Sequence, residues 1–252
     1  MKYTEQDYEY LEGKKFSSAY FMKLENNPLY ERIELIKHIT EGKSVIHVGC
    51  CDHVDLIKEK MEKNRWLHRI LEENCEEVLG IDICEEAVNY VNVNNYSQRH
   101  VYCADITSKE FKNIVPYKKY DYVLLGEILE HVDNPVCFLT EMNNTLKDYG
   151  FDGKYIITVP NAFSLQRLFY LNGVEGINTD HKYWFTPFTL GKVLTDAGIV
   201  PQEVLFASFA KGGNGKNKFT EFMFVVLETL RRRPSNYKSF RGSQLVVIGK
   251  TK

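Results

Sequence analysis

Short runs of apolar residues recur along the chain after residue 40 and alternate with amphipathic stretches. Runs rich in β-branched and aromatic residues predict strands at 44–48, 77–82, 100–105, 120–125 and 154–159. Between them, residues 85–94 carry apolar side chains at helical spacing, and another helix is predicted through 55–57. Strands that alternate with helices are typical of a parallel sheet covered on both faces, so the expected fold class is α/β.

The two ends of the chain depart from this alternation. Residues 1–40 carry many aromatic side chains and are predicted to form a mainly helical N-terminal cover. Residues 202–207 and 244–248 predict two strands that are separated by a glycine-rich loop and by a helix at 219–233, which Pro234 ends. No repeat or domain boundary is evident, so we expect a single domain over 1–252, with a cover at 1–40 and a core at 41–252.

Composition excludes several classes of protein. The chain is 44% hydrophobic and 26% charged, which allows a sizeable core and argues against wholesale disorder. Its net charge of −2 gives no bulk attraction to nucleic acid or to anionic membranes. The N-terminus lacks the apolar segment of a signal peptide, and no apolar run reaches the roughly 18 residues of a membrane span. We therefore expect a cytoplasmic protein without membrane partners.

The six cysteines do not form any C-x-x-C pair, so a structural zinc site is not expected. Without a secretion signal they are interpreted as free thiols. The adjacent residues Cys50 and Cys51 allow two interpretations, a redox-active pair or two small residues in a tight loop, and the second is favoured.

The candidate chemistry centres on Glu127, Glu130 and His131, directly after the fourth strand. A helix that begins there would place positions i, i+3 and i+4 on one face, at the strand end where open α/β sheets bind ligands. Two carboxylates and an imidazole suit a divalent cation, and the polar segment 179–185 could supply a fourth ligand. The alternative is an ion-paired first helical turn with acids near its N-terminus.

Other strand ends carry ligand-type residues as well. Gly49 ends the first strand, where a glycine lets the backbone approach a ligand closely. Asp82 ends the second strand, and its carboxylate could accept both hydroxyl hydrogens of a ribose. Asp105 ends the third, where it could face an adenine amino group. Each aspartate could instead cap the helix that follows it, but the three strand ends together favour a nucleoside-containing ligand.

At this point the chain resembles the class I S-adenosylmethionine-dependent methyltransferases. The resemblance covers roughly residues 40–250 and rests on the segments 45–50, 80–83, 104–106, 126–132 and 157–161, with 180–186 and the helix before Gly198 in support. It implies a Rossmann-like, seven-stranded sheet with an antiparallel last strand and helices on both faces, to which the predicted N-terminal helical cover is added. The expected activity is that of an enzyme, a methyltransferase with S-adenosylmethionine as its cofactor.

The resemblance also assigns the cofactor contacts residue by residue. Gly49 and Cys50 would approach the methionine part, Asp82 and Ile83 the ribose, and Asp105 and Ile106 the adenine. The first loop departs from the family pattern, because His47 stands at its usual acidic position. Cys51 and His53 stand where further glycines are usual.

Within the family, the Glu-x-x-Glu-His sequence followed by Asp180-His181-Lys182 resembles the small-RNA 3′-terminal 2′-O-methyltransferases. That resemblance implies a cation, Mg²⁺ or Mn²⁺, held by Glu127, Glu130, His131 and His181. Without a metal, His131 or His181 would be the catalytic general base. The segment 160–165 also resembles bacterial methyltransferases associated with surface-polysaccharide synthesis.

The expected function is therefore O-methylation of a small polar acceptor, a sugar or a precursor of a capsule or surface polysaccharide. Arg167 is predicted to help bind an anionic acceptor. Three alternatives remain open: an RNA 2′-O-methyltransferase, a non-catalytic cofactor-binding relative, and a nicotinamide-dependent oxidoreductase. The compact, slightly acidic chain argues against a nucleic-acid partner. The apolar helix near 219–230 would suit either the core or a homodimer face.

Overall fold

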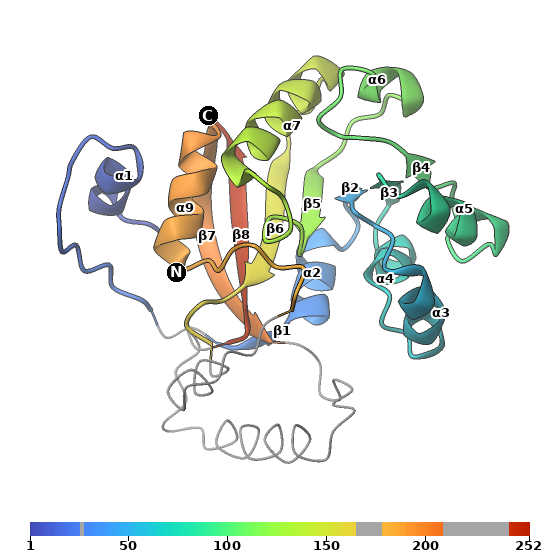
Figure 1. Ribbon diagram of the computed structural model, residues 1–252, viewed down its shortest axis with the longest axis horizontal. Helices are drawn as coiled ribbons and strands as arrows, with labels where there is room; N and C mark the ends of the chain where they lie inside the picture. The colour runs from blue at the N-terminus through green and yellow to red at the C-terminus, as the bar shows by residue number, and fades with distance from the viewer. Residues whose placement is uncertain (26–27, 165–177, 209–241) are drawn as a thin grey trace, which may run out of the picture.

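The computed structural model describes residues 1–25, 28–164, 178–208 and 242–252, and within them the strands form one sheet. Its eight strands lie in the order β1-β7-β8-β6-β5-β2-β3-β4 (Figure 1). Their bounds are β1 Tyr30–Glu31, β2 Ser44–Val48, β3 Glu77–Asp82, β4 Tyr102–Cys103, β5 Tyr122–Gly126, β6 Lys154–Pro160, β7 Ile199–Ser208 and β8 Gln244–Thr251. The last strand, β8, is antiparallel to both of its neighbours, as the sequence predicts. The sheet gains its eighth strand from β1, which pairs with β7.

Alternate residues of the strands face two helical layers. On β5, Val123 and Leu125 belong to a core shared with α7 (Pro135–Tyr149) and α9 (Pro187–Asp196). Leu124, between them, packs into a second core with α2 (Arg32–Thr40) and α4 (Leu67–Asn74). The period of two in strand burial thus confirms the predicted sheet with helices on both faces.

The remaining helices complete these layers. Helix α3 is Val54–Glu62, α5 is Glu85–Val93, and α6 is the short turn Phe111–Ile114. Helices α3, α4 and α5 cluster around β3 and β4 at one end of the sheet, whereas α9 lies against β7 at the other (Figure 1). Among the described residues, none of the helices is both long and apolar enough to cross a lipid bilayer.

The prediction of a mainly helical N-terminal cover is only partly right. Helix α1 (Glu5–Leu11) and α2 are helical, but the described residues between Glu12 and Leu29 contain neither helix nor strand. The start of the chain is nevertheless tied to the sheet, because the backbone of Met1 bonds to that of Val204. Tyr3 is buried and donates its hydroxyl to the carbonyl of Pro187.

The third predicted strand, 100–105, is much shorter than expected. The amide of Asn92, on α5, occupies both backbone groups of Val101: Oδ1 accepts from its N–H and Nδ2 donates to its carbonyl. Those groups are then unavailable to a β ladder, so pairing with β3 is limited to Tyr102–Cys103. The predicted loop at 212–215, helix at 219–233 and Arg167 lie outside the described residues.

Candidate functional site

A cavity of about 1350 Å³ opens at the carboxyl ends of β2, β3, β5 and β6. Gly49 and Asp82 line one side of it, and Gly126 and Pro160 line another. Parallel sheets with helices on both faces bind their ligands at this edge. The cavity therefore lies where the strand-end residues of the sequence predict a site.

The loop after β2 makes a close turn at Gly49, whose φ of +62° is a backbone conformation that other residues rarely adopt. A Cβ on Gly49 would also lie 3.0 Å from Cδ1 of Ile128. Beyond the glycine, the loop is fixed by side chains: the indole N–H of Trp66 donates to the carbonyl of Cys50 at 3.1 Å, and the N–H of Cys51 donates to Asp82 at 2.9 Å.

Asp82 holds two backbone segments at the end of β3, but it does not cap α5, whose N-cap residue is Cys84. Its carboxylate accepts the backbone N–H of Cys51 on one oxygen and that of Cys84 on the other. The side chain is 9% exposed, and burial raises its pKa although the backbone hydrogen bonds oppose the shift. Each carboxylate oxygen has a further lone pair, so Asp82 can hold the loop and still accept hydrogen bonds from a ligand in the cavity.

The structure brings three of the six predicted cofactor residues to the cavity wall, namely Gly49, Cys50 and Asp82. The other three are not among its lining residues. Ile83 is 72% exposed, and Ile106 is buried in the core. Asp105 accepts hydrogen bonds from the backbone and the hydroxyl of Thr107 within a turn after β4. It does not cap α6, whose N-cap residue is Glu110, so the helix-capping alternative is wrong for this residue.

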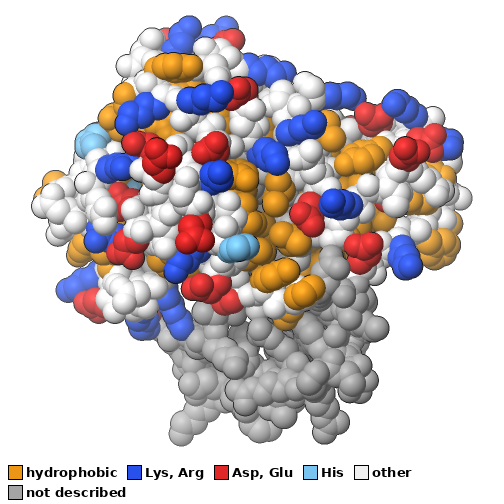
Figure 2. Space-filling model, turned by 180° about the vertical axis from the view of Figure 1, so that it is seen from behind, with side chains coloured by type: hydrophobic (Ala, Val, Ile, Leu, Met, Phe, Trp, Pro, Cys, Tyr) orange, Lys and Arg blue, Asp and Glu red, His pale blue; other side chains and the backbone are white. Residues whose placement is uncertain are grey.

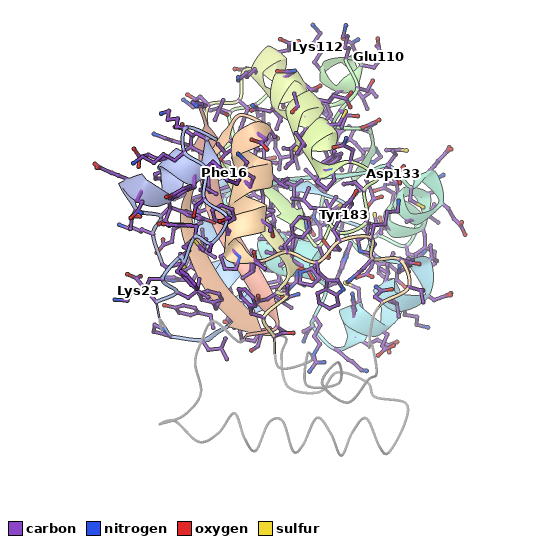
Figure 3. The ribbon with its side chains drawn as sticks, turned by 60° about the vertical axis from the view of Figure 1, so that its left-hand side comes forward. Phe16, Lys23, Glu110, Lys112, Asp133 and Tyr183 are labelled. Carbon is purple, nitrogen blue, oxygen red and sulfur yellow. The ribbon has the colours of Figure 1, made fainter. Side chains whose placement is uncertain are left out.

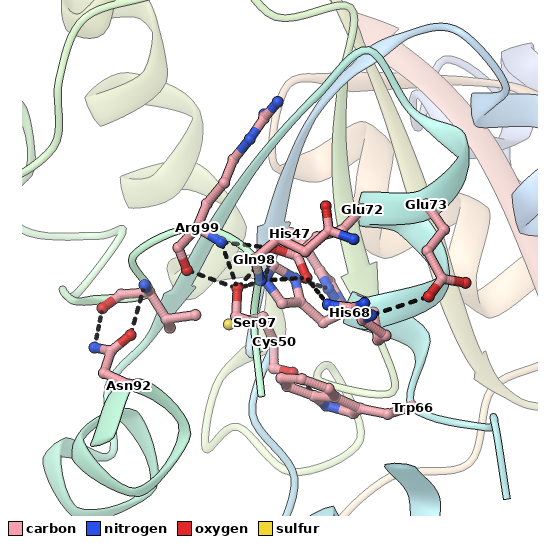
Figure 4. A network of polar contacts seen from close by, with 12 residues as sticks. His47, Cys50, Trp66, His68, Glu72, Glu73, Asn92, Ser97, Gln98 and Arg99 are labelled. Atoms are coloured by element: carbon pink, nitrogen blue, oxygen red, sulfur yellow. Dashed lines mark hydrogen bonds and ion pairs between the residues drawn. The ribbon is translucent and has the colours of Figure 1, made fainter. Parts of the chain in front are cut away.

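The sequence reasoning missed the buried partner of His47. His47 lines the cavity, and its Nδ1 lies 3.2 Å from Nδ1 of His68 on α4 (Figure 4). Burial lowers the pKa of His47 well below its usual value, with His68 and Arg32 adding to the effect. Burial likewise lowers the pKa of His68 to about 4, against the attraction of Glu72. Both rings are therefore neutral near pH 7. The sequence signal that could have pointed to this pair was the unusual His47 at the position where the family has an acidic residue.

Glu127–His131 does not form the first turn of a helix, so that prediction is wrong. Glu127 has a φ of +59°, and the chain continues in turns until Asn134 caps α7, with Pro135 as its first helical residue. An asparagine cap followed by a proline is a strong signal for a helix start. Helix α7 therefore begins four residues beyond His131, the last of these candidate ligands in the loop.

Glu127, predicted as a metal ligand, is hydrogen-bonded instead to side chains of two strands, β6 and β8. Its carboxylate accepts the hydroxyl of Thr158 at 2.8 Å and the amide of Gln244 at 2.7 Å. Burial raises its pKa, while the nearby guanidinium of Arg32 and these hydrogen bonds oppose the shift. Both oxygens of Glu127 are thus engaged by protein groups.

The other three predicted metal ligands do converge. One ligand atom each from Glu130, His131 and His181 lies within 4.8 Å of the others. The carboxylate of Glu130 is fully buried, and neither of its oxygens has a hydrogen-bond partner. Burial, followed by repulsion from Glu127, raises its pKa to about 8. Nδ1 of His181 is also buried without a partner.

The segment before α9 supplies the groups that orient this cluster. Nδ1 of His131 lies 3.2 Å from the carbonyl of Asp180, which favours the proton on that nitrogen. In the neutral ring, Nε2 then carries no proton and its lone pair can bind a cation. The N–H of Lys182 donates to the carbonyl of Glu130 at 2.7 Å. Tyr183 donates its hydroxyl to the carbonyl of Asp133, and Figure 3 shows the two residues side by side. These bonds join the two loops that carry the histidines.

Comparison with known proteins identifies the family. A family described as "Methyltransferase domain" matches residues 20–204. The chain belongs to this family. The predicted methyltransferase class and the cofactor S-adenosylmethionine are therefore confirmed at the level of the domain family.

Individual relatives are distant. The chain is 29% identical over 114 residues to N-methyltransferase 4 of Papaver somniferum. The aligned region is 44% of this chain and 28% of that protein. It is 25% identical over 198 residues to the mitochondrial ubiquinone biosynthesis O-methyltransferase of Dictyostelium discoideum. This aligned region is 73% of this chain and 52% of the relative. The chain thus spans about a quarter and about half of the lengths of these two proteins.

The fold is also that of solved methyltransferases. The magnesium protoporphyrin IX methyltransferase of Synechocystis PCC 6803, solved with bound S-adenosylhomocysteine, superimposes with a TM-score of 0.51 at 14% identity, over 88% of this chain and 82% of that one. This likeness confirms the Rossmann-like α/β fold.

Proposed function

We propose that the protein is an S-adenosylmethionine-dependent O-methyltransferase that acts on a small polar acceptor with the help of a divalent cation. The acceptor class that we favour is a sugar or a precursor of a surface polysaccharide. The observation that carries the proposal is the cluster of Glu130, His131 and His181. Two of its members, His131 and His181, line the same cavity as Gly49 and Asp82.

The residues present fit a cation. A fully buried carboxylate without hydrogen-bond partners is costly, and such a group calls for an explanation. A cation on Glu130 would satisfy its oxygens and favour the ionised carboxylate. One carboxylate and two imidazoles form a ligand set for a borderline divalent ion such as Mn²⁺, and Mg²⁺ would depend mainly on the carboxylate and on acceptor or water oxygens. Such a cation supplies Lewis-acid polarisation, which lowers the pKa of an acceptor hydroxyl.

Without a bound cation, the histidines would support proton removal from the acceptor instead. Burial and the neighbouring His131 lower the pKa of His181, so that its imidazole is neutral near pH 7. A neutral imidazole in the cavity wall can act as a general base toward a bound hydroxyl. The displacement at the sulfonium carbon then depends on alignment of acceptor and cofactor within one cavity.

A carbohydrate acceptor agrees with the surroundings of the cluster. Trp184 lines the cavity and is 37% exposed, so its ring is available to the apolar face of a sugar. On the face seen in Figure 2, basic and acidic side chains are interspersed rather than gathered into a basic stripe. Together with the net charge of −2, this favours a small acceptor over RNA.

The test is transfer of a labelled methyl group from S-adenosylmethionine, with Mn²⁺ or Mg²⁺, to panels of sugar nucleotides, oligosaccharides and short RNAs with free 3′ ends. We expect label on a carbohydrate hydroxyl, dependence on the cation, and loss of transfer in Glu130→Gln and His181→Ala. Cys137→Ser, at an exposed position outside the cavity lining, is the matched control. Transfer only to RNA, or only to a nitrogen, would contradict the proposal.

A further inference from the structure

The cavity is lined by a second group of potential ligands, separate from the histidine cluster. The Sγ atoms of Cys50 and Cys51 lie 4.0 Å apart. A carboxylate oxygen of Asp82 lies within 4.8 Å of both sulfurs. All three residues line the cavity, and Cys51 is partly exposed in it.

The spacing of the sulfurs is close to what a tetrahedral ion requires. Zinc–sulfur bonds of about 2.3 Å at a tetrahedral angle place two thiolate sulfurs roughly 3.8 Å apart. The observed separation of Cys50 and Cys51, 4.0 Å, differs little from that value. A carboxylate oxygen can be the third ligand of such an ion, and the fourth position is then available to water or another ligand.

The backbone around these side chains is fixed before any ion binds. The indole of Trp66 holds the carbonyl of Cys50, and the N–H of Cys51 donates to the carboxylate of Asp82. The N–H of Cys50 donates to the carbonyl of Ile81 at 3.1 Å. The two thiols therefore occupy set positions relative to the carboxylate, which reduces the ordering cost of binding.

We propose that Cys50, Cys51 and Asp82 form a site for a thiophilic divalent cation, such as Zn²⁺ or Cd²⁺, and that an ion bound there excludes S-adenosylmethionine. The exclusion rests on the proposed cofactor contacts, because the ion would occupy the Asp82 carboxylate and the Cys50–Cys51 loop that we assign to the cofactor. The site differs from the histidine cluster in ligand chemistry. Thiolates select Zn²⁺ and Cd²⁺ over Mg²⁺ and Mn²⁺, so Mg²⁺ and Mn²⁺ would not fill the cysteine site. Two imidazoles and a carboxylate also accept Zn²⁺, so the histidine cluster must be disabled when the cysteine site is tested.

Coordination replaces the thiol protons, so each cysteine releases one proton to the buffer as its bond to the ion forms. Ion affinity should therefore increase as the pH is raised from 6 to 8.

The experiment uses Cd²⁺ as probe with the full chain in the Glu130→Gln background, which disables the histidine cluster. We expect a thiolate-to-cadmium absorption band that saturates at one ion per chain. At free Cd²⁺ of ten times its dissociation constant, competitive binding should weaken S-adenosylhomocysteine affinity about elevenfold by calorimetry. Cys51→Ser should weaken Cd²⁺ affinity at least about tenfold, whereas Cys137→Ser should leave the band unchanged.

Circular dichroism of each variant separates loss of the site from loss of the fold, and Cys51→Ala provides a second, smaller substitution at the half-buried position. Absence of the band at saturating Cd²⁺, or a band that survives in folded Cys51→Ser and Cys51→Ala, would overturn the site. A band that depends on Cys51 while S-adenosylhomocysteine binding stays unchanged would overturn the exclusion.

Discussion

The imidazole ring of His131 meets that of His181 edge to face, with the ring centroids 4.8 Å apart. The two residues come from different loops, one after β5 and one before α9. Their contact places two ring nitrogens beside the buried carboxylate of Glu130, whose oxygens lack hydrogen-bond partners. A long-range contact thus assembles the group of donors that the proposed cation needs.

The first prediction concerns that cation. Chelation with EDTA should abolish methyl transfer, while the affinity for S-adenosylhomocysteine changes less than about twofold, because Gly49 and Asp82 do not belong to the cluster. Mn²⁺ or Mg²⁺ should restore transfer. Binding of Mn²⁺ can be followed by electron paramagnetic resonance without any acceptor, and His181→Ala should weaken it at least about tenfold. Full activity after rigorous chelation would contradict the metal role and would leave His131 or His181 as the general base.

The second prediction separates the two glutamates. Glu127→Gln should lower the free energy of unfolding by about 1–3 kcal/mol, because the amide cannot accept from both Thr158 and Gln244. Its Mn²⁺ affinity should stay close to that of the wild type, whereas Glu130→Gln should lose Mn²⁺ binding. Urea unfolding and the resonance titration measure the two effects. Equal loss of Mn²⁺ in both variants would restore the four-ligand set that the sequence suggested.

Local sequence signals were sufficient for most of the sheet. Strands β2 and β3 have the predicted bounds, because their apolar runs are short, β-branched and ended by Gly49 or followed by a turn. The shortened β4 could not be foreseen, since it depends on the side chain of Asn92 binding Val101 across a loop. Propensity carries no information about such a contact.

In the candidate site too, local sequence patterns predicted some features, whereas others depend on long-range contacts. A helical face was the wrong reason for grouping Glu130 with His131, because the cap and proline at Asn134–Pro135 delay the helix. The grouping with His181 came from resemblance. The pairing of His47 with His68 lay beyond any local pattern, because it depends on how α4 packs against β2 and β3.

The third prediction concerns the cofactor. Asp82→Ala should weaken binding of S-adenosylmethionine by about 1.5–3 kcal/mol, as expected for loss of a charge-assisted hydrogen bond. Asp105→Ala is the matched control, because its carboxylate bonds to Thr107 and does not line the cavity. Calorimetry with S-adenosylhomocysteine compares the two. If Asp105→Ala proved the more damaging variant, the adenine role that the sequence suggested for it would be favoured.

The fourth prediction concerns the acceptor side of the cavity. Trp184→Ala should raise the KM for a carbohydrate acceptor by about tenfold, since the exposed indole would lose its contact with the sugar ring. Cofactor affinity should not change, because Trp184 belongs to the segment before α9 that carries His181, whereas Asp82 ends β3. Trp184→Phe should recover most of the loss. Equal effects on cofactor and acceptor would indicate a structural role.

The last prediction is the pH dependence that the buried His68 gives to stability. Its pKa is about 4 in the folded protein and near the usual 6.5 in the unfolded chain. The unfolded state therefore binds the extra proton between these values, so stability is fully present above pH 6.5 and is lost as the pH falls toward 4. Between pH 7 and pH 5 this amounts to about 2 kcal/mol. Urea unfolding of wild type and His68→Gln at both pH values should show the wild type losing more stability by about that amount. Because His68 also contributes to the lowered pKa of His47, the difference between the two proteins reports the His47–His68 pair, while groups such as Glu130 titrate in both. An identical pH dependence in the two proteins would mean that His68 is not held neutral by the fold.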